Sequence, residues 1–234
     1  MKNDIYFDIE TAPDLSEGAL AAAIAAVEAP GQYKKPESIA EWKAANAEAI
    51  GREAWQRSAL DPLVGGIYVI GYSIGGGPAS IVSRDPRSDT DESAWLDHAL
   101  KVVAEAAHDV YDGRPAAPRF IGWNIIGFDL PYIAKRCVIH GITPALRLPL
   151  ANRYNGERVL DLMQAWSPNP KDWTKQSKVA AALGLSIKND IDGSQLWAAV
   201  ESGGVQVAAE KCAKDVAQLV EIHRRMSAVY GLAA

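Results

Sequence analysis

Two carboxylates near the N-terminus have the types and spacing of a metal site. Residues 5–11 read Ile-Tyr-Phe-Asp-Ile-Glu-Thr, a run of β-forming residues in which apolar and acidic side chains alternate. Because successive side chains of a strand point to opposite faces, Asp8 and Glu10 share one face, about 7 Å apart. Hard divalent cations such as Mg²⁺ or Mn²⁺ would neutralise this pair, since unpaired buried charges are costly. An edge strand with one solvated face would also explain the pattern.

Two more acidic residues lie where they could join this pair. Asp129 ends the run Asn-Ile-Ile-Gly-Phe-Asp, between a short predicted strand and a predicted helix. It could equally be the N-cap of that helix, with Pro131 in the first turn. Asp215 lies on a late helix beside an apolar stripe formed by Cys212, Val216 and Leu219, so we expect it at the buried edge rather than in solvent.

The elements that must position these residues are strands early in the chain and helices later. Apolar alternation and turn residues predict strands at 5–11, 67–74, 79–83 and 119–123. Helical spacing predicts helices at 92–110, 130–140, 171–183, 195–201 and 207–230. Residues 159–162 fit either a strand or the start of a helix. This order of elements indicates an α/β or α+β fold.

An alanine-rich stretch separates the first two strands. Residues 14–60 predict two helices, at 19–29 and 39–58, and carry Trp42 and Trp55. We interpret the stretch as a helical insertion in which the tryptophans pack internally. Because no repeat or low-complexity linker interrupts the sequence, we expect residues 1–234 to form a single domain.

Composition excludes several classes of protein. The chain has 234 residues and a net charge of −5, which argues against a protein that coats nucleic acid through bulk electrostatics, although not against an enzyme that binds a few phosphates. Cys137 and Cys212 fall among apolar neighbours and predict reduced, buried thiols. The sequence shows neither a secretory signal nor an apolar run of about 18 residues, so we expect a cytoplasmic protein without a membrane partner.

Together these motifs resemble the three exonuclease motifs of the DEDD superfamily of 3′–5′ exonucleases. Segments 7–11, 122–124, 181–184, 192–194 and 212–216 more closely resemble stand-alone exonucleases related to the proofreading domain of family-B DNA polymerases. The resemblance extends over nearly the whole chain except residues 14–60. It implies an RNase H-like α/β fold, with a mixed sheet flanked by helices.

The resemblance also implies a two-metal site. Four carboxylates would hold two Mg²⁺ or Mn²⁺ ions, which stabilise the entering and leaving oxygens during hydrolysis of a phosphodiester. These carboxylates belong to Asp8, Glu10, Asp129 and Asp215. The residues expected to bind substrate are Thr11, Trp123, Asn124 and Phe128, and Trp123, Phe128 and Tyr132 are the candidates for base stacking.

One position departs from the family. The related exonucleases carry Tyr four residues, or His five residues, before the last Asp, where this chain has Lys211 and Glu210. Lys211 lies one helical turn from Asp215, so both can face the same site. It would position or deprotonate the attacking water, or it would only pair with a carboxylate or a phosphate. A weakened or inactive enzyme is the remaining alternative.

We therefore expect a metal-dependent 3′–5′ exonuclease that releases 5′-mononucleotides, with single-stranded DNA as the favoured substrate. An exoribonuclease would show the same carboxylates, and a non-catalytic nucleic-acid-binding or interaction module on this fold is the alternative from another class. Any polymerase or repair partner would act in trans. Asp161 is a further polar candidate or a helix cap, while Arg147 and Lys188 would contact phosphates or lie in solvent.

Overall fold

A computed structural model describes residues 4–110, 118–149, 158–185, 191 and 193–232. Contacts divide the chain into two compact units, residues 1–10 with 67–234 and residues 11–66, which are described separately.

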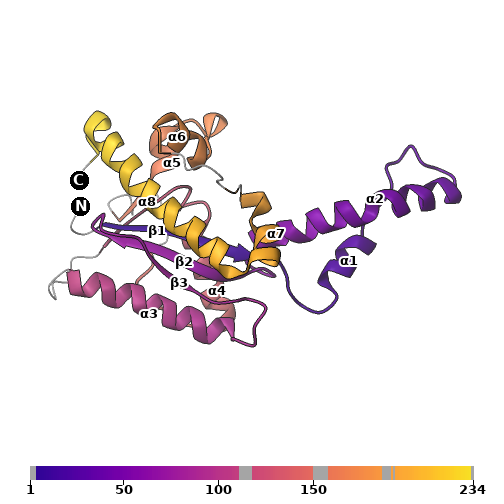
Figure 1. Cartoon of the computed structure of the whole chain (residues 1–234), viewed down its shortest axis with the longest axis horizontal. Helices are drawn as coiled ribbons and strands as arrows, with labels where there is room; N and C mark the ends of the chain where they lie inside the picture. Colours follow the sequence, from indigo (N-terminus) through magenta and orange to yellow (C-terminus); the bar gives the residue numbers. More distant parts are fainter. Residues whose placement is uncertain (1–3, 111–117, 150–157, 186–190, 192, 233–234) are drawn as a thin grey trace. The chain divides into compact units, whose positions relative to one another are not determined.

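The larger unit is built on a five-stranded sheet with the strand order β3-β2-β1-β4-β5 (Figure 1). β1 pairs in parallel with β4, and β4 with β5, whereas β2 and β3 form an antiparallel hairpin. The strands are β1 Asp4–Ala12, β2 Gly66–Ile74, β3 Ser80–Ser83, β4 Arg119–Gly122 and β5 Val159–Asp161. The mixed sheet confirms the predicted α/β class.

Helices cover both faces of this sheet, and Figure 1 shows α3 and α8 on either side of the strands. Ile5, Phe7 and Ile9 of β1 pack into a core cluster with residues of α3 and α4. Tyr6 points to the opposite face, where it packs with residues of α8. The helices of this unit are α3 Glu92–Val110, α4 Asp129–His140, α5 Leu162–Trp166, α6 Gln176–Ala182, α7 Gly193–Gly203 and α8 Val205–Tyr230.

The sequence predictions differ from the structure mainly at the ends of elements. Residues 159–162 contain both alternatives, because β5 ends at Asp161 and α5 begins at the next residue. The helix expected over 171–183 is shorter, since a 3₁₀ turn, η2 Pro170–Asp172, precedes α6. Both cysteines are buried and free, as predicted. No helix among the described residues is long and apolar enough to cross a membrane.

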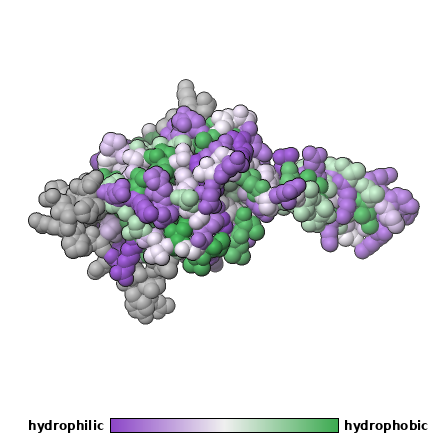
Figure 2. Space-filling view, turned by 90° about the horizontal axis from the view of Figure 1, so that it is seen from below, coloured by the Kyte–Doolittle hydropathy of each residue, from purple (hydrophilic) through white to green (hydrophobic). Residues whose placement is uncertain are grey.

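The smaller unit contains the two expected helices, α1 Ala19–Ala25 and α2 Pro36–Arg57, followed by the 3₁₀ turn η1 Ser58–Leu60. α1 ends at Ala25, four residues before the predicted end, and α2 begins earlier than predicted because proline suits a first helical position. Trp55 is buried, and its indole Nε1 donates to the Asp14 carbonyl at 2.6 Å. Hydrophilic and hydrophobic side chains are interspersed over these helices (Figure 2).

A close approach between β2 and α8 fixes the depth at which α8 lies on the sheet. A Cβ atom added at Gly71 would lie 2.6 Å from Cys212 Sγ and 3.0 Å from Val216 Cγ2. The absence of a side chain at Gly71 therefore allows α8 to pack directly on the strand backbone.

We expect Gly71→Ala to lower the free energy of unfolding by about 1–3 kcal/mol, because the added methyl group overpacks this contact. Urea denaturation measures the loss. The matched control is Gly193→Ala, where an added Cβ has no neighbour within 4 Å. Equal effects of the two substitutions on the free energy of unfolding would contradict the close approach. Adding Cys212→Ala to Gly71→Ala should restore part of the lost stability, because it removes the sulfur that the new methyl group would contact.

Candidate active site

Carboxylates from three separate elements converge beside the middle of the sheet. Asp8 and Glu10 project from the α8 side of β1, and their oxygens lie within 4.8 Å of each other and of Cys212 Sγ. Asp129, the first residue of α4, accepts a hydrogen bond from the Ile9 backbone N–H at 3.1 Å. Asp215 approaches from α8 and adds to the negative potential at Asp8. The four acids predicted from the sequence are therefore brought together.

Asp129 does not cap α4, so the capping alternative is wrong. The capping position is taken by Phe128, whose side chain makes no capping hydrogen bond. Asp129 is 3 % exposed, and its carboxylate binds the backbone of β1 between the two other acids. This bond locks the start of α4 to the first strand.

Lys211 bridges the acidic groups of the strand and the helix. Its Nζ donates to Glu10 Oε1 at 2.9 Å and to Asp215 Oδ2 at 2.6 Å. The three side chains are 11–17 % exposed, so solvent screens these ion pairs only partly. The expectation that Lys211 and Asp215 face the same site is confirmed.

The electrostatics of the cluster are those of a site that lacks positive charge. Burial, followed by the charges of Glu10, Asp129 and Asp215, raises the pKa of Asp8 well above its usual range, and Lys211 opposes the shift. Burial raises the pKa of Asp129 to about 7, against the backbone N–H groups that bind its carboxylate. Burial also raises the pKa of Glu10, although Lys211 again lowers it. Each of these carboxylates would be stabilised by an added cation.

The charges of the neighbouring carboxylates favour the protonated form of Lys211. Burial lowers its pKa, but the charges of Glu10, Asp215 and Asp8 outweigh burial and raise that pKa well above its usual range. A lysine that stays charged cannot accept a proton, so this arrangement favours a positioning or ion-pairing role over that of a base.

Cys212 is a neighbour of the site that the sequence analysis assigned only to the core. Its Sγ lies 3.3 Å from Asp8 Oδ2 and 3.7 Å from the Asp8 carbonyl oxygen. Burial, then the charges of Asp8 and Glu10, raises the pKa of this thiol well above its usual range. The signal was present in the spacing, because residues 211, 212 and 215 lie along one side of a helix.

Asp161 organises the loop that leads to Asp129. Its Oδ1 accepts from the Asn124 N–H at 3.1 Å and its Oδ2 from the Ile126 N–H at 3.2 Å. It also caps α5 by accepting from the N–H groups of Met163 and Gln164. The loop is tightly bent, since Asn124 has a φ of 59°. The capping role weighed for Asp161 is thus confirmed.

The residues expected to bind substrate have different environments. Trp123 donates its indole N–H to the Thr174 carbonyl at 3.0 Å, and Phe128 is half-buried with its ring 5.3 Å from that of Tyr132. Tyr132 is 2 % exposed, so the prediction that it stacks on a base is wrong as the ring is placed. Thr11 follows Glu10 on β1 but belongs to the smaller unit. Arg147 is exposed, and Lys188 lies outside the described residues.

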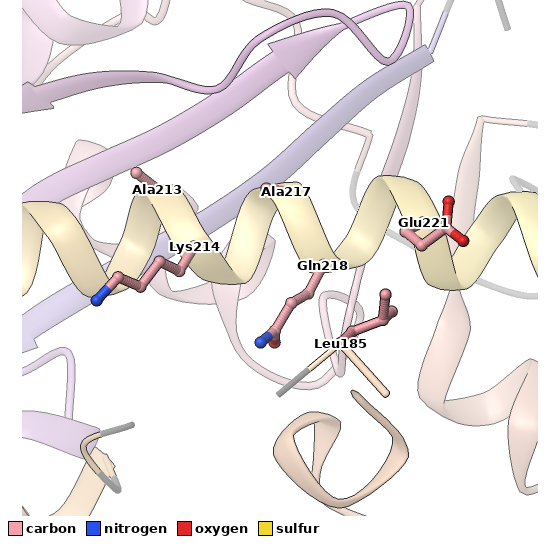
Figure 3. A pocket seen from close by; sticks show the side chains of 6 residues that line it. All are labelled: Leu185, Ala213, Lys214, Ala217, Gln218 and Glu221. Atoms are coloured by element: carbon pink, nitrogen blue, oxygen red, sulfur yellow. The ribbon is translucent and has the colours of Figure 1, made fainter. Parts of the chain in front are cut away.

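A separate depression of about 350 Å³ lies against α8 (Figure 3). Figure 3 shows Gln218 and Leu185 facing this space, and the other lining residues are Ala213, Lys214, Ala217 and Glu221. The lining includes none of the four carboxylates and not Lys211, although Lys214 and Gln218 lie one helical turn from Lys211 and Asp215. The depression is therefore not the carboxylate site.

We expect Asp161→Ala to lower the free energy of unfolding by about 2–4 kcal/mol, because the substitution removes a helix cap and leaves loop N–H groups without their acceptor. Urea denaturation measures the loss. Asn169→Ala is the control, since within the described residues Asn169 accepts from the Lys171 N–H alone, at the start of η2. A loss no larger than that of the control would show that Asp161 does not organise the loop.

Comparisons with known proteins agree with this geometry. Residues 96–232 match a family described as predicted 3′–5′ exonucleases related to the exonuclease domain of PolB. The structure is similar to that of the family B DNA polymerase from the hyperthermophilic archaeon Pyrobaculum calidifontis, with a TM-score of 0.57 and 15 % identity. That similarity covers 95 % of this chain but 24 % of the polymerase chain, and it supports the RNase H-like fold. No curated protein matches the sequence. The chain belongs to the family of predicted 3′–5′ exonucleases related to the exonuclease domain of PolB.

Proposed function

We propose that this protein is a divalent-metal-dependent 3′–5′ exonuclease that removes 5′-mononucleotides from single-stranded DNA. The observation that carries the proposal is the convergence of acidic side chains from β1, α4 and α8 on one partly exposed place. Membership in the exonuclease family gives the reaction class, and the acidic cluster supplies groups suited to it.

The residues present fit a pair of divalent ions. All four carboxylates are hard oxygen donors, which Mg²⁺ and Mn²⁺ prefer. Burial and mutual repulsion raise the pKa of Asp8, which is the behaviour of a cluster that a cation would stabilise. When bound, two such ions would supply a nucleophile at neutral pH and stabilise charge on the entering and leaving oxygens. The ligands would be Asp8, Glu10, Asp129 and Asp215.

Lys211 acts in this proposal as a fixed positive charge. Its bonds to Glu10 and Asp215 hold the β1 and α8 carboxylates in register before any ligand arrives. Because the ammonium group keeps its proton, its role at a bound phosphodiester is to pair with phosphate oxygen. In this proposal the attacking water gives its proton to a group other than Lys211.

A segment next to the site supplies a surface for the DNA strand. Trp123 holds this segment through the Thr174 carbonyl, and Gln176 Nε2 donates to the Asp215 backbone carbonyl at 2.9 Å. Just before these anchors in the sequence, Trp173 is 48 % exposed, and Lys171 is also exposed. An exposed indole beside cations suits a single strand, because every base offers a face for stacking and every linkage a charge.

We expect Asp8→Asn to reduce exonuclease activity at least about 100-fold, because the substitution removes one ligand charge while keeping the size of the side chain. Activity is measured as shortening of a 5′-labelled single strand with Mg²⁺ or Mn²⁺. The melting temperature without metal should not fall, since one charge leaves a repelling cluster. Added Mn²⁺ should raise the melting temperature of the unsubstituted protein by more than that of the variant.

Asp97→Asn is the matched control, because Asp97 is a half-buried acid of α3 that pairs only with Lys101 among the described residues. It should keep full activity. If the unsubstituted protein shortens neither DNA nor RNA strands at any dose with either metal, the proposed function is wrong. If the protein shortens RNA strands faster than DNA strands of the same sequence, its substrate is RNA rather than single-stranded DNA.

We expect Trp173→Ala to raise KM for single strands about 10-fold with little change in kcat, because stacking on the indole face is lost. Steady-state kinetics on strands of several lengths measure the separate effects on KM and kcat. Tyr230→Ala removes another exposed aromatic residue, at the end of α8, and should leave KM unchanged. An unchanged KM for Trp173→Ala would show that the strand does not cross this segment.

A further inference from the structure

The Tyr68 hydroxyl is a buried polar group that the proposed mechanism does not use. Tyr68 lies on β2 and is 0 % exposed. Within the described part of the chain, its hydroxyl has no hydrogen-bond partner. Burial of an unbonded hydroxyl costs stability, and such groups are uncommon in folded proteins. The hydroxyl is therefore a candidate to bind a group that changes position during function.

The strand pairing places Tyr68 beside Glu10. β1 and β2 are neighbours in the sheet, and the Gly75 N–H after the end of β2 donates to the Asp4 carbonyl at the start of β1. The two strands therefore run in opposite directions. Tyr68 precedes Gly75 by seven residues and Glu10 follows Asp4 by six, so the two residues lie at nearly the same level.

Tyr68 also lies on the same face of the sheet as the carboxylates. Its ring contacts that of Trp197 in α7 edge-on, with centroids 6.0 Å apart and an interplanar angle of 90°. α7 packs against α8, the helix that carries Lys211. After burial, the charge of Glu10 is the largest influence that raises the pKa of the Tyr68 phenol, and Lys211 opposes it.

Glu10 loses a hydrogen-bond donor when Lys211 moves. Among the described residues, the hydrogen bond that Glu10 accepts comes from Lys211 Nζ. In the proposed function, Lys211 pairs with a substrate phosphate, which draws the ammonium away from Glu10. A metal ion would take part of the Glu10 carboxylate, but Glu10 is only 8 % exposed, so water would solvate its remaining lone pairs poorly.

We propose that Tyr68 is a positioning residue whose hydroxyl donates a hydrogen bond to the Glu10 carboxylate when Lys211 turns to the substrate. The inference rests on the proposed function only for the identity of the group that attracts Lys211. A phenol suits this task because it donates without adding a cation that competes for the carboxylate. The edge-on contact with Trp197 holds the ring, so the donor is positioned in advance.

A double-mutant cycle measured without metal tests the proposal independently of nuclease activity. Lys211→Met removes the ammonium and keeps most of the side-chain volume, so Glu10 must take another donor. In the unsubstituted background, Tyr68→Phe removes an unbonded hydroxyl and should leave the melting temperature equal or higher. In the Lys211→Met background, the same change should lower the melting temperature by about 2–4 °C, because the hydroxyl is then bonded to Glu10.

Ser227→Ala is the matched control. The Ser227 hydroxyl is also buried and unbonded among the described residues, but Ser227 follows Lys211 by sixteen residues along α8. Its effect should be the same in both backgrounds. An effect of Tyr68→Phe that is also the same in both would overturn the proposal.

If the Lys211→Met variant does not fold, the steady-state kinetics of the Tyr68→Phe variant test the proposal. We expect kcat to fall about 10-fold, the loss typical of a group that orients a metal ligand, with KM unchanged. An unchanged kcat would overturn the proposal. A protein without nuclease activity that still shows the coupling would refute the proposed function and leave the Tyr68–Glu10 interaction standing.

Discussion

The constraint on which the site depends is the repulsion among carboxylates that the fold forces together. β1 presents Asp8 and Glu10 on one face, and α4 and α8 add two more acids. In water such a cluster would disperse, but here each acid is fixed by a different element of a packed core. Lys211 supplies one positive charge, which offsets only part of the repulsion. The remaining negative charge is what a bound cation would offset in the proposed function.

The packing around this cluster serves to keep α8 close to the sheet. Gly71 leaves room for Cys212 and Val216, and this contact brings Lys211 within reach of β1. On the other side, Asp161 binds the loop before α4 through its backbone N–H groups, so Asp129 meets the Ile9 N–H. Neither Gly71 nor Asp161 needs to take part in chemistry. Both fix distances that the charged groups alone would not keep.

Local pattern was enough to predict much of this arrangement from the sequence. Alternation in residues 5–11 predicted the face shared by Asp8 and Glu10, and helical spacing predicted that Lys211 and Asp215 lie together. The same reasoning could not decide between the roles of Asp129, because a helix cap and a bond to β1 use the same residue type at the same place. Only the tertiary structure, which brings Ile9 to Asp129, makes that choice.

Contacts between distant segments account for what sequence reasoning missed. The sequence predicts only a core residue at Cys212, and the structure adds its contact with Asp8 of β1. Tyr68 is one of several aromatic strand residues in the sequence, and the structure places its strand next to that of Glu10. This bears on the position where related exonucleases have tyrosine and this chain has Lys211. A lysine there supplies charge but no neutral donor. Tyr68 offers a neutral phenol from β2, the strand next to the one that carries Glu10. Charge and neutral hydrogen bonding would then come from two elements, so the lysine can turn to a phosphate while Glu10 keeps a donor.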